Sequence, residues 1–263
     1  MRSNLALAKW RAGEQTIGGW LQLGNAHSAE MMASAGFDWL CLDMQHGLID
    51  YGDLRFMLPA ISTTDVTPLV RVAGNIPSQI MKVLDAGAMG VIVPLVNSRE
   101  EAAAAVAACR YPPGGTRSFG PIRAALYGGR GYAAEANGEI ACIVMVETKE
   151  AVANLEAIVT TPGVDGVYIG PNDLALALGM PPRGDTHDEP HASTVARILD
   201  VCKRHKMPIG IHASSPEFIR LRLEAGFNFV PAGSDAGFIG AGAAQAAAAA
   251  RGVAKKQAET TGY

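Results

Sequence analysis

The feature that most constrains the fold is a regular alternation of short apolar runs with longer segments of helical spacing. Eight runs are rich in β-branched or other apolar residues, and most are separated by ten or more residues with a helical period. Such alternation predicts parallel βα units. The predicted strands are residues 17–23, 39–43, 67–72, 90–94, 140–147, 163–169, 207–211 and 228–231. The clearest predicted helices are residues 27–35, 51–61, 77–86, 99–110, 194–205 and 216–225.

Eight βα units predict a (βα)8 TIM barrel, and 263 residues is a length that one such barrel fills. A doubly wound open sheet is the competing architecture, because the order of elements does not show closure. The even count of strands favours the barrel, as does the absence of a GxGxxG motif after the first strand. We therefore expect one domain over residues 1–263, with about 253–263 as a flexible tail.

The composition is that of a globular α/β protein. Hydrophobic residues make up 49% of the chain, and aromatic residues only 6%, which predicts a core of Val, Ile, Leu and Ala. The net charge is -3 and no block of Lys and Arg is present, so nucleic-acid binding is not expected. The four cysteines stand alone, and we expect them to be buried thiols in a reducing compartment. No signal-like or membrane-length apolar run appears, which predicts a cytoplasmic protein.

Three segments depart from the regular alternation. Residues 111–137 are rich in Gly, Pro and Arg and too long for an ordinary connection, so they are either a functional loop or a contact surface, with Arg117 and Arg123 best read as interface residues. Residues 180–190 form a polar segment, and the neighbouring His187 and His191 are interpreted as part of a solvated loop. The alanine-rich residues 241–259 predict a terminal helix. That helix either packs on a neighbouring subunit, where it would be exchanged, or docks on its own barrel.

Candidate functional residues follow the predicted strands, where the loops of a parallel barrel converge on one rim. Glu147 and Asp173 follow neighbouring strands, so the two carboxylates can meet. Hard oxygen ligands without clustered Cys or His suit Mg²⁺ or Mn²⁺, with Co²⁺ as a further candidate. An acid pair bridged to Arg71 or to a lysine is the alternative. The other strand-end residues are Gln22, Asp43, Gln45, His46, Arg71, Pro94, Gly170, Asn172, His212, Ser234 and Asp235.

The motif Gly170-Pro171-Asn172-Asp173 predicts a turn that leads directly into a helix. The backbone N–H groups of Gly170, Asn172 and Asp173 are free to bind an anion there, whereas Pro171 has no N–H group. A metal ion beside such a helix start can receive a carboxylate and an adjacent oxygen. The expected ligand is therefore a 2-oxo acid.

These residues carry a family resemblance over nearly the whole chain. The chain resembles the HpcH/HpaI aldolases, which are class II metal-dependent 2-oxo acid aldolases built on a TIM barrel. The motifs that carry it are Asp43-Met44-Gln45-His46-Gly47, Val70-Arg71-Val72, Leu84-Asp85-Ala86-Gly87-Ala88, Val93-Pro94, Tyr111-Pro112-Pro113-Gly114-Gly115-Thr116-Arg117, Val146-Glu147-Thr148 and Gly170-Pro171-Asn172-Asp173-Leu174.

The resemblance implies a role for each matching residue. Glu147 and Asp173 match the metal ligands, and Arg71 matches the arginine that contacts the keto oxygen of a pyruvate-type donor. His46 matches a histidine that handles protons, and Asp85 matches an aspartate that pairs with this histidine from an adjacent subunit. Asp85 ends a predicted helix and so faces the other end of its own barrel, which agrees with a shared site. A homo-oligomer follows, commonly a hexamer with an exchanged C-terminal helix.

Two residues depart from the family pattern. Position 45 is Gln where many relatives carry Glu, and position 145 is Met where they carry Gln. Both should lie beside the metal shell, where Asp43 and Gln45 would orient the ligands. The loss of one negative charge should change the acidity of metal-bound water.

Three functions remain in competition at this point. The first is a divalent-metal-dependent aldolase that forms or cleaves 4-hydroxy-2-oxo acids from pyruvate or hydroxypyruvate and an aldehyde. The second is a malyl- or citramalyl-thioester lyase, which needs a basic groove for CoA phosphates. The third is a non-catalytic barrel that binds carboxylic acids. For His212, substrate contact and a structural hydrogen bond both remain open, and aldehyde selectivity is expected near Gln22 and residues 119–123.

Overall fold

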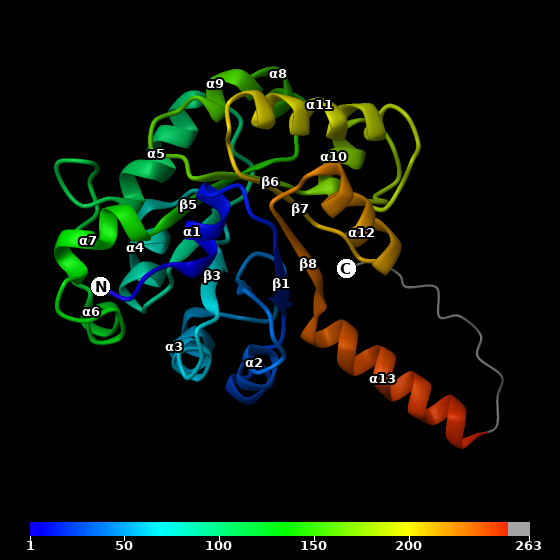
Figure 1. The fold of residues 1–263 in the computed structure, drawn as a ribbon, viewed down its shortest axis with the longest axis horizontal. Helices are drawn as coiled ribbons and strands as arrows, with labels where there is room; N and C mark the ends of the chain where they lie inside the picture. Colours follow the sequence, from blue (N-terminus) through cyan, green and yellow to red (C-terminus); the bar gives the residue numbers. More distant parts are fainter. Residues whose placement is uncertain (252–263) are drawn as a thin grey trace.

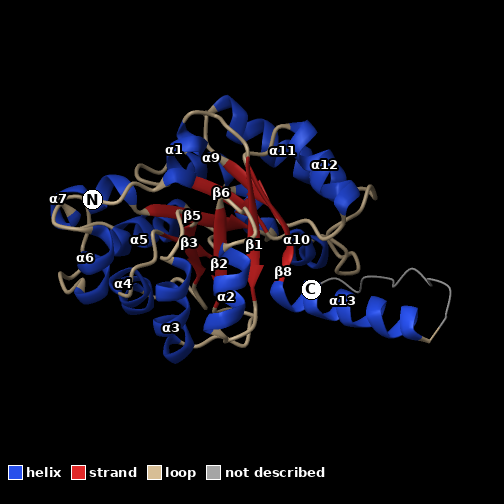
Figure 2. Cartoon of the chain, turned by 60° about the horizontal axis from the view of Figure 1, so that its bottom comes forward, coloured by secondary structure: helices blue, strands red, loops and turns tan. Residues whose placement is uncertain are grey.

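The computed structural model describes residues 1–251, and its centre is a closed parallel barrel. The strands pair in sequence order and β8 returns to β1, which confirms the predicted TIM barrel and excludes the open sheet. Figure 2 shows the strands at the centre with helices around them. The strands are β1 Thr16–Leu21, β2 Trp39–Asp43, β3 Thr67–Arg71, β4 Gly90–Val93, β5 Ala141–Val146, β6 Gly166–Ile169, β7 Ile209–Ile211 and β8 Phe229–Ser234.

Two of the predicted helices, residues 51–61 and 216–225, have the bounds that the sequence predicts. The strand predicted from residue 163 begins at Gly166 instead, because Gly163 has a φ of 91° and forms a turn. The helices are α1 Leu5–Arg11, α2 Ala26–Ala33, α3 Tyr51–Ile61, α4 Pro77–Asp85, α5 Arg99–Cys109, α6 Ile122–Gly128, α7 Tyr132–Glu139, α8 Lys149–Ala153, α9 Leu155–Val159, α10 Pro171–Ala177, α11 His191–Arg204, α12 Pro216–Ala225 and α13 Asp235–Ala250.

The core has two layers of different composition. Between the strands and the helices it consists mainly of Val, Ile, Leu and Ala, as the composition predicts. Inside the barrel the prediction is wrong, because four aromatic side chains fill much of the space: Trp20, Trp39, Tyr168 and Phe229. Tyr168 stacks on Trp20 at a centroid distance of 5.6 Å and on Phe229 at 5.8 Å. These four aromatic side chains build the floor of the barrel mouth.

Glycines in the strands make room for these rings. A Cβ atom at Gly18 would lie 2.1 Å from the Trp39 ring, and one at Gly210 would lie 2.3 Å from the Phe229 ring. Real Cβ atoms do not approach other atoms so closely, so a side chain at either position would displace a buried ring. The aromatic layer and the glycines therefore depend on each other.

The opposite end of the barrel is covered by α1. The Trp10 ring stacks on Phe229 at 4.4 Å, and its Nε1 donates a hydrogen bond to Thr16 Oγ1 at 2.7 Å. Asn4 caps the helix by accepting from the N–H of Leu7. Because this end is covered, access to the barrel interior is from the carboxyl ends of the strands.

The segment 111–137 is not an unstructured loop, because it carries α6 and α7. Arg117 is 1% exposed, and its guanidinium donates to Asp85 and to the hydroxyl of Tyr132. The interpretation of Arg117 as an interface residue is therefore wrong for its side chain, which is buried within its own chain. Its neighbours Phe119 and Ile122 are exposed apolar side chains, so the segment does present a surface.

The helix α13 projects from the barrel, as Figure 1 shows. Asp235, its first residue, is the buried residue of the helix, whereas Phe238 and Ile239 are exposed. This arrangement does not match docking along its own barrel, and exchange with another subunit stays a prediction. The predicted flexible tail at 253–263 lies outside the described residues. Within residues 1–251, no helix combines the length and the apolar character that a membrane span needs.

Candidate active site

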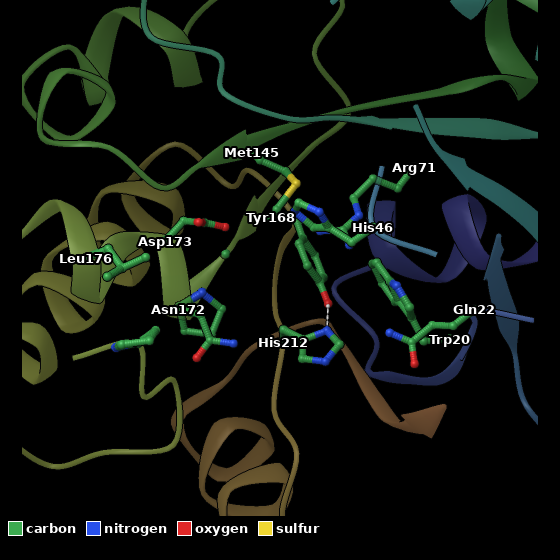
Figure 3. Close-up of a pocket in the computed structure, with 13 residues that line it drawn as sticks. Trp20, Gln22, His46, Arg71, Met145, Tyr168, Asn172, Asp173, Leu176 and His212 are labelled. Atoms are coloured by element: carbon green, nitrogen blue, oxygen red, sulfur yellow. Dashed lines mark hydrogen bonds between the residues drawn. The ribbon is translucent and has the colours of Figure 1, made fainter. Parts of the chain in front are cut away.

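A pocket of about 250 Å³ opens at the carboxyl ends of the strands. It lies where the sequence predicts the functional residues, and Figure 3 shows its side chains converging. Seven of the predicted strand-end residues line it, together with Trp20 and Tyr168 of the aromatic floor. The lining residues are Trp20, Gln22, His46, Arg71, Met145, Tyr168, Gly170, Pro171, Asn172, Asp173, Leu176, Pro182 and His212. No lysine of the described residues lines this pocket: Lys82 lies on α4 and Lys149 begins α8.

A bidentate ion pair at the pocket wall joins Asp43 and Arg71. These residues are partners in the register of β2 and β3, so their side chains leave the barrel side by side. Arg71 Nε donates to Asp43 Oδ1 at 2.8 Å, and Nη2 donates to Oδ2 at 2.5 Å. Asp43 is fully buried and also accepts from Trp20 Nε1 at 3.1 Å. The bidentate pair holds the guanidinium in one orientation at the pocket wall.

Asp43 also shapes the loop after β2. Its Oδ1 accepts the backbone N–H groups of Gln45 at 3.1 Å and of His46 at 3.2 Å. Burial alone would raise the pKa of Asp43, but the hydrogen bonds and the charge of Arg71 outweigh burial and lower that pKa. Asp43 therefore stays ionised at neutral pH and positions Arg71 and the loop that carries His46. Its predicted role in orienting the metal ligands stays a prediction.

Glu147 and Gly170 lie next to each other because Val146 and Ile169 are partners in the register of β5 and β6. A Cβ atom at Gly170 would lie 2.1 Å from Glu147 Oε2, so only glycine leaves room for this carboxylate. The other oxygen, Oε1, accepts the N–H of Leu95 at 2.9 Å. Glu147 is 1% exposed, so the backbone around it sets the position of its carboxylate.

The negative charge of Asp173 acts on the carboxylate of Glu147, and the convergence of both on one metal ion stays a prediction. The pKa of Glu147 is raised to about 7, mainly by burial. The charge of Asp173 adds to this rise, whereas the Leu95 N–H and the charge of Arg71 oppose it. Neither carboxylate forms an ion pair within residues 1–251, so the predicted alternative of an acid pair bridged to a basic side chain is not what the structure shows. Two adjacent carboxylates without a bound cation repel each other, and a divalent cation would relieve that repulsion.

The donor set fits a hard divalent cation with an open coordination shell. No group of three or more His, Cys, Asp or Glu side chains that could hold a metal occurs among the described residues. Glu147 and Asp173 would supply two oxygen ligands and leave the other positions to water and substrate. Mg²⁺ and Mn²⁺ are bound in this way, through one or two carboxylates and substrate oxygens.

The predicted helix start after β6 is confirmed, since α10 begins at Pro171 with Gly170 as its N-cap. The N–H groups of Asn172 and Asp173 lie in the first turn, where a helix offers no backbone acceptor. Both residues line the pocket. Polar backbone groups and the Asp173 carboxylate therefore face the same space.

The two departures from the family pattern lie in different places. Met145 lines the pocket, and its Cε would lie 3.0 Å from a Cβ at Gly170, so it contacts the surroundings of Glu147. Gln45 does not line the pocket. Its side-chain Oε1 is buried and has no hydrogen-bond partner among the described residues.

His46 and Asp85 are both predicted to be catalytic, but one chain does not bring them together. His46 is exposed at the pocket mouth, and its ring makes no hydrogen bond within residues 1–251. Asp85 ends α4 and accepts from the buried Arg117 at 2.7 Å. The carboxylate of Asp85 is therefore held in place by Arg117, whereas the ring of His46 is free to bind a partner.

Several pocket residues were missed or left open by the sequence prediction. Tyr168 lies inside an apolar run, and only its place on β6 below the rim brings its hydroxyl to the pocket. His212 was left open, and it lines the pocket with Nδ1 3.3 Å from the Tyr168 hydroxyl. The prediction of a solvated loop is wrong for His191, which is fully buried and bonds the carbonyl of Pro171 at 2.9 Å.

Comparison with known proteins gives a consistent picture. Residues 16–240 match the family model described as HpcH/HpaI aldolase/citrate lyase. The chain is 43% identical to a hydroxypyruvate/pyruvate aldolase of Rhizorhabdus wittichii, over 92% of this chain and 96% of the relative. It is 40% identical to a 2-dehydro-3,6-dideoxy-6-sulfogluconate aldolase of Pseudomonas putida, over 94% and 97%. A crystal structure of an HpcH/HpaI aldolase/citrate lyase family protein from Burkholderia cenocepacia J2315 superposes with a TM-score of 0.89 at 34% identity, covering 95% of this chain and 100% of the other.

Without divalent cations, the free energy of unfolding should depend on pH through Glu147, and Glu147→Gln should remove this dependence. The folded-state pKa is about 7 and the ordinary value is 4.5, so the folded protein binds more protons between these values than the unfolded chain. The stability of the unsubstituted protein should therefore fall as pH rises from 4.5 to 7, by about 3 kcal/mol in all. The Gln variant should not show this fall. Urea unfolding at several pH values, with chelator present, measures the difference.

The matched control is Glu224→Gln, which removes an exposed carboxylate outside the pocket. Its stability should follow that of the unsubstituted protein at every pH. A constant offset between the Glu147→Gln variant and the unsubstituted protein from pH 4.5 to 8 would contradict the electrostatic account of the acid pair.

Proposed function

Because this chain belongs to the HpcH/HpaI aldolase/citrate lyase family, we propose that its pocket forms and cleaves 4-hydroxy-2-oxo acids from a pyruvate-type donor and an aldehyde. The chain is a pyruvate-type aldolase, a carbon–carbon lyase of class II. The observation that carries the proposed site is that the oriented Arg71 and Asp173 line one pocket, with the carboxylate of Glu147 directly behind its wall at Gly170. One side of this pocket can hold a cation, and the other can hold a developing negative charge.

A bound divalent metal, Mg²⁺ or Mn²⁺, would supply Lewis acidity that stabilises negative charge on the keto oxygen of the donor. Glu147 and Asp173 would hold it. Arg71 donates its remaining N–H groups to the same keto oxygen as charge develops there, and Asp43 keeps the guanidinium aimed at that atom. This arrangement favours removal of a proton from C3 of the donor, because the resulting enolate carries its charge beside Arg71.

The other polar groups of the pocket bind the substrate and move its proton. The first-turn N–H groups of Asn172 and Asp173 are placed to hold the donor carboxylate. His46, at the mouth, moves the proton at C3 or at the aldol hydroxyl. Gln22 lies on the wall formed by β1 and can contact the aldehyde. The aromatic floor excludes water from below.

The thioester-lyase alternative fits this pocket less well. Arg71 is the only lysine or arginine among the lining residues, and its guanidinium is paired with Asp43. Binding of the CoA phosphates needs several free cationic groups. The pocket volume of about 250 Å³ suits a small 2-oxo acid with a short aldehyde.

Chelation should abolish aldol turnover, and metal should restore it. After treatment with EDTA we expect turnover of pyruvate with an aldehyde to fall at least about a hundredfold and to return with Mg²⁺ or Mn²⁺. Glu147→Gln and Asp173→Asn should stay inactive after metal is added back. The control Glu150→Gln removes an exposed carboxylate just beyond the same strand and should respond like the unsubstituted protein. Turnover that is indifferent to chelation would overturn the metal-dependent function.

We further propose that catalysis needs a second copy of the chain, with Asp85 of one subunit beside His46 of another. The free ring of His46 and the fixed carboxylate of Asp85 support this arrangement, as does the projecting α13 with its exposed apolar residues. A hexamer with an exchanged α13 and a cytoplasmic location stay predictions.

Mixing two inactive variants should restore activity if the site is shared. Asp85→Asn subunits keep His46, and His46→Asn subunits keep Asp85, so some interfaces in mixed oligomers contain both intact residues. After dissociation and random reassociation at equal amounts, about a quarter of the sites should be intact. The readout is aldol turnover of the mixture against each variant alone. No recovery in mixtures shown by mass spectrometry to contain both subunits would remove Asp85 from the shared site.

A further inference from the structure

The pocket has a second polar wall, and the proposed chemistry gives no role to His212 at its centre. Asp173 and Arg71 line the charged side of the pocket, and the buried Glu147 adjoins that side next to Gly170. Figure 3 shows His212 with the amide side chains of Asn172 and Gln22 to either side of it, away from Asp173 and Arg71. These three side chains are hydrogen-bonding groups that carry no fixed charge. A ligand that spans the pocket therefore meets an ionic environment at one end and a hydrogen-bonding environment at the other.

The imidazole of His212 is held in one place. Its Nδ1 lies 3.3 Å from the Tyr168 hydroxyl, and its ring meets the Trp20 ring edge-on at a centroid distance of 5.2 Å. The backbone N–H of His212 donates to the carbonyl of Ile169 at 3.3 Å. Tyr168 is itself fixed by stacking between Trp20 and Phe229. A ring held by two side-chain contacts on a hydrogen-bonded backbone can present its remaining nitrogen in a defined direction.

The hydrogen bond to Tyr168 determines which nitrogen carries the proton. Burial, with the nearby charge of Arg71, lowers the pKa of His212 to about 4, and burial raises the pKa of Tyr168, so both groups are neutral at neutral pH. A neutral imidazole has one donor and one acceptor nitrogen. If the Tyr168 hydroxyl donates to Nδ1, the proton lies on Nε2. The reverse arrangement would leave the Tyr168 O–H without an acceptor, since His212 is its only hydrogen-bond partner among residues 1–251.

The second nitrogen is free to bind a substrate. Nε2 of His212 has no hydrogen-bond partner in the described part of the chain, and it is not among the fully enclosed polar atoms. It is thus an N–H donor on the wall of a substrate pocket. A neutral donor beside two neutral amides favours an uncharged oxygen acceptor over a carboxylate, because none of the three supplies a compensating positive charge.

We propose that His212 is a specificity-determining residue whose Nε2–H donates a hydrogen bond to a hydroxyl oxygen of the substrate. The proposal rests on the proposed aldolase function and names the substrate class, a hydroxylated rather than a purely apolar partner. The hydroxyl belongs either to C3 of the donor, as in hydroxypyruvate, or to the carbon next to the aldehyde carbonyl. Tyr168 acts as a positioning residue, because it sets the tautomer and orientation of the imidazole.

Substitutions at residue 212 can separate recognition from a structural role. His212→Asn places an amide near the position of Nδ1 and can keep the bond to Tyr168, but it removes the donor at Nε2. His212→Gln places an amide nitrogen near Nε2, and His212→Leu removes both polar groups. The exposed His27 on α2 lies outside the pocket, so His27→Leu is the matched control.

The measurement is a ratio of kcat/KM values for substrates that differ by one hydroxyl. Hydroxypyruvate is compared with pyruvate at one aldehyde, and glycolaldehyde is compared with acetaldehyde at one donor. The preference for the hydroxylated member should fall about tenfold in His212→Leu and His212→Asn, the size expected for one hydrogen bond between neutral groups. His212→Gln should keep part of the preference, and Tyr168→Phe should lower it. His27→Leu should leave both ratios unchanged.

The outcomes show whether the hydroxyl belongs to the donor or to the aldehyde, and whether His212 recognises substrate or only stabilises the fold. A fall confined to the donor ratio assigns the bond to the C3 hydroxyl, and a fall confined to the aldehyde ratio assigns it to the acceptor. Unchanged ratios in His212→Asn and His212→Leu, with a lower melting temperature in the latter, would show a structural histidine and overturn the proposal. Turnover by the unsubstituted protein distinguishes failure of the His212 proposal from failure of the proposed aldolase function. Turnover of pyruvate without any effect at residue 212 removes this inference alone, whereas absence of turnover removes the aldolase function.

Discussion

The bidentate pair between Asp43 and Arg71 is the interaction on which the rest of the pocket depends. It joins β2 to β3 at the carboxyl end of the barrel, and Asp43 is fully buried within it. The same carboxylate accepts the indole N–H of Trp20 and two N–H groups of the loop that carries His46. Removal of either charge would leave the other buried and unpaired, which is costly in a protein interior. One ion pair thus sets the orientation of the guanidinium, the aromatic floor and the loop with the histidine.

Close packing around a glycine positions the Glu147 carboxylate. Gly170 leaves the space that Glu147 Oε2 occupies, in the same way that Gly18 and Gly210 leave space for aromatic rings inside the barrel. The aromatic floor lies below both the charged wall with Asp173 and Arg71 and the neutral wall with His212. Burial at this floor keeps His212 and Tyr168 uncharged at neutral pH. Reactivity and selectivity can therefore be assigned to opposite walls of one small pocket, built on a floor that serves both.

The sequence predicts the barrel and most rim residues because both follow from local patterns. An unbroken apolar run that ends in a charged residue identifies Glu147 and Arg71 as strand ends, and the Gly-Pro pair identifies the start of α10. What it does not predict depends on register and on contacts between distant segments. The pairing of Asp43 with Arg71 needs the alignment of two strands, and the burial of Arg117 needs α6 and α7 to fold over α4. The composition likewise does not reveal that a few aromatic residues gather inside the barrel.

The central claim is that this pocket stabilises the enolate of a pyruvate-type donor, and proton exchange at the methyl group of pyruvate tests it most directly. In D₂O, with Mg²⁺ or Mn²⁺ and no aldehyde, NMR should show deuterium entering the methyl group at a rate that depends on the protein. The exchange reports enolate formation whatever the natural aldehyde is. Exchange that is present in the unsubstituted protein and lost in Arg71→Lys and Glu147→Gln is the predicted result. A methyl group that exchanges no faster than in buffer would contradict the account.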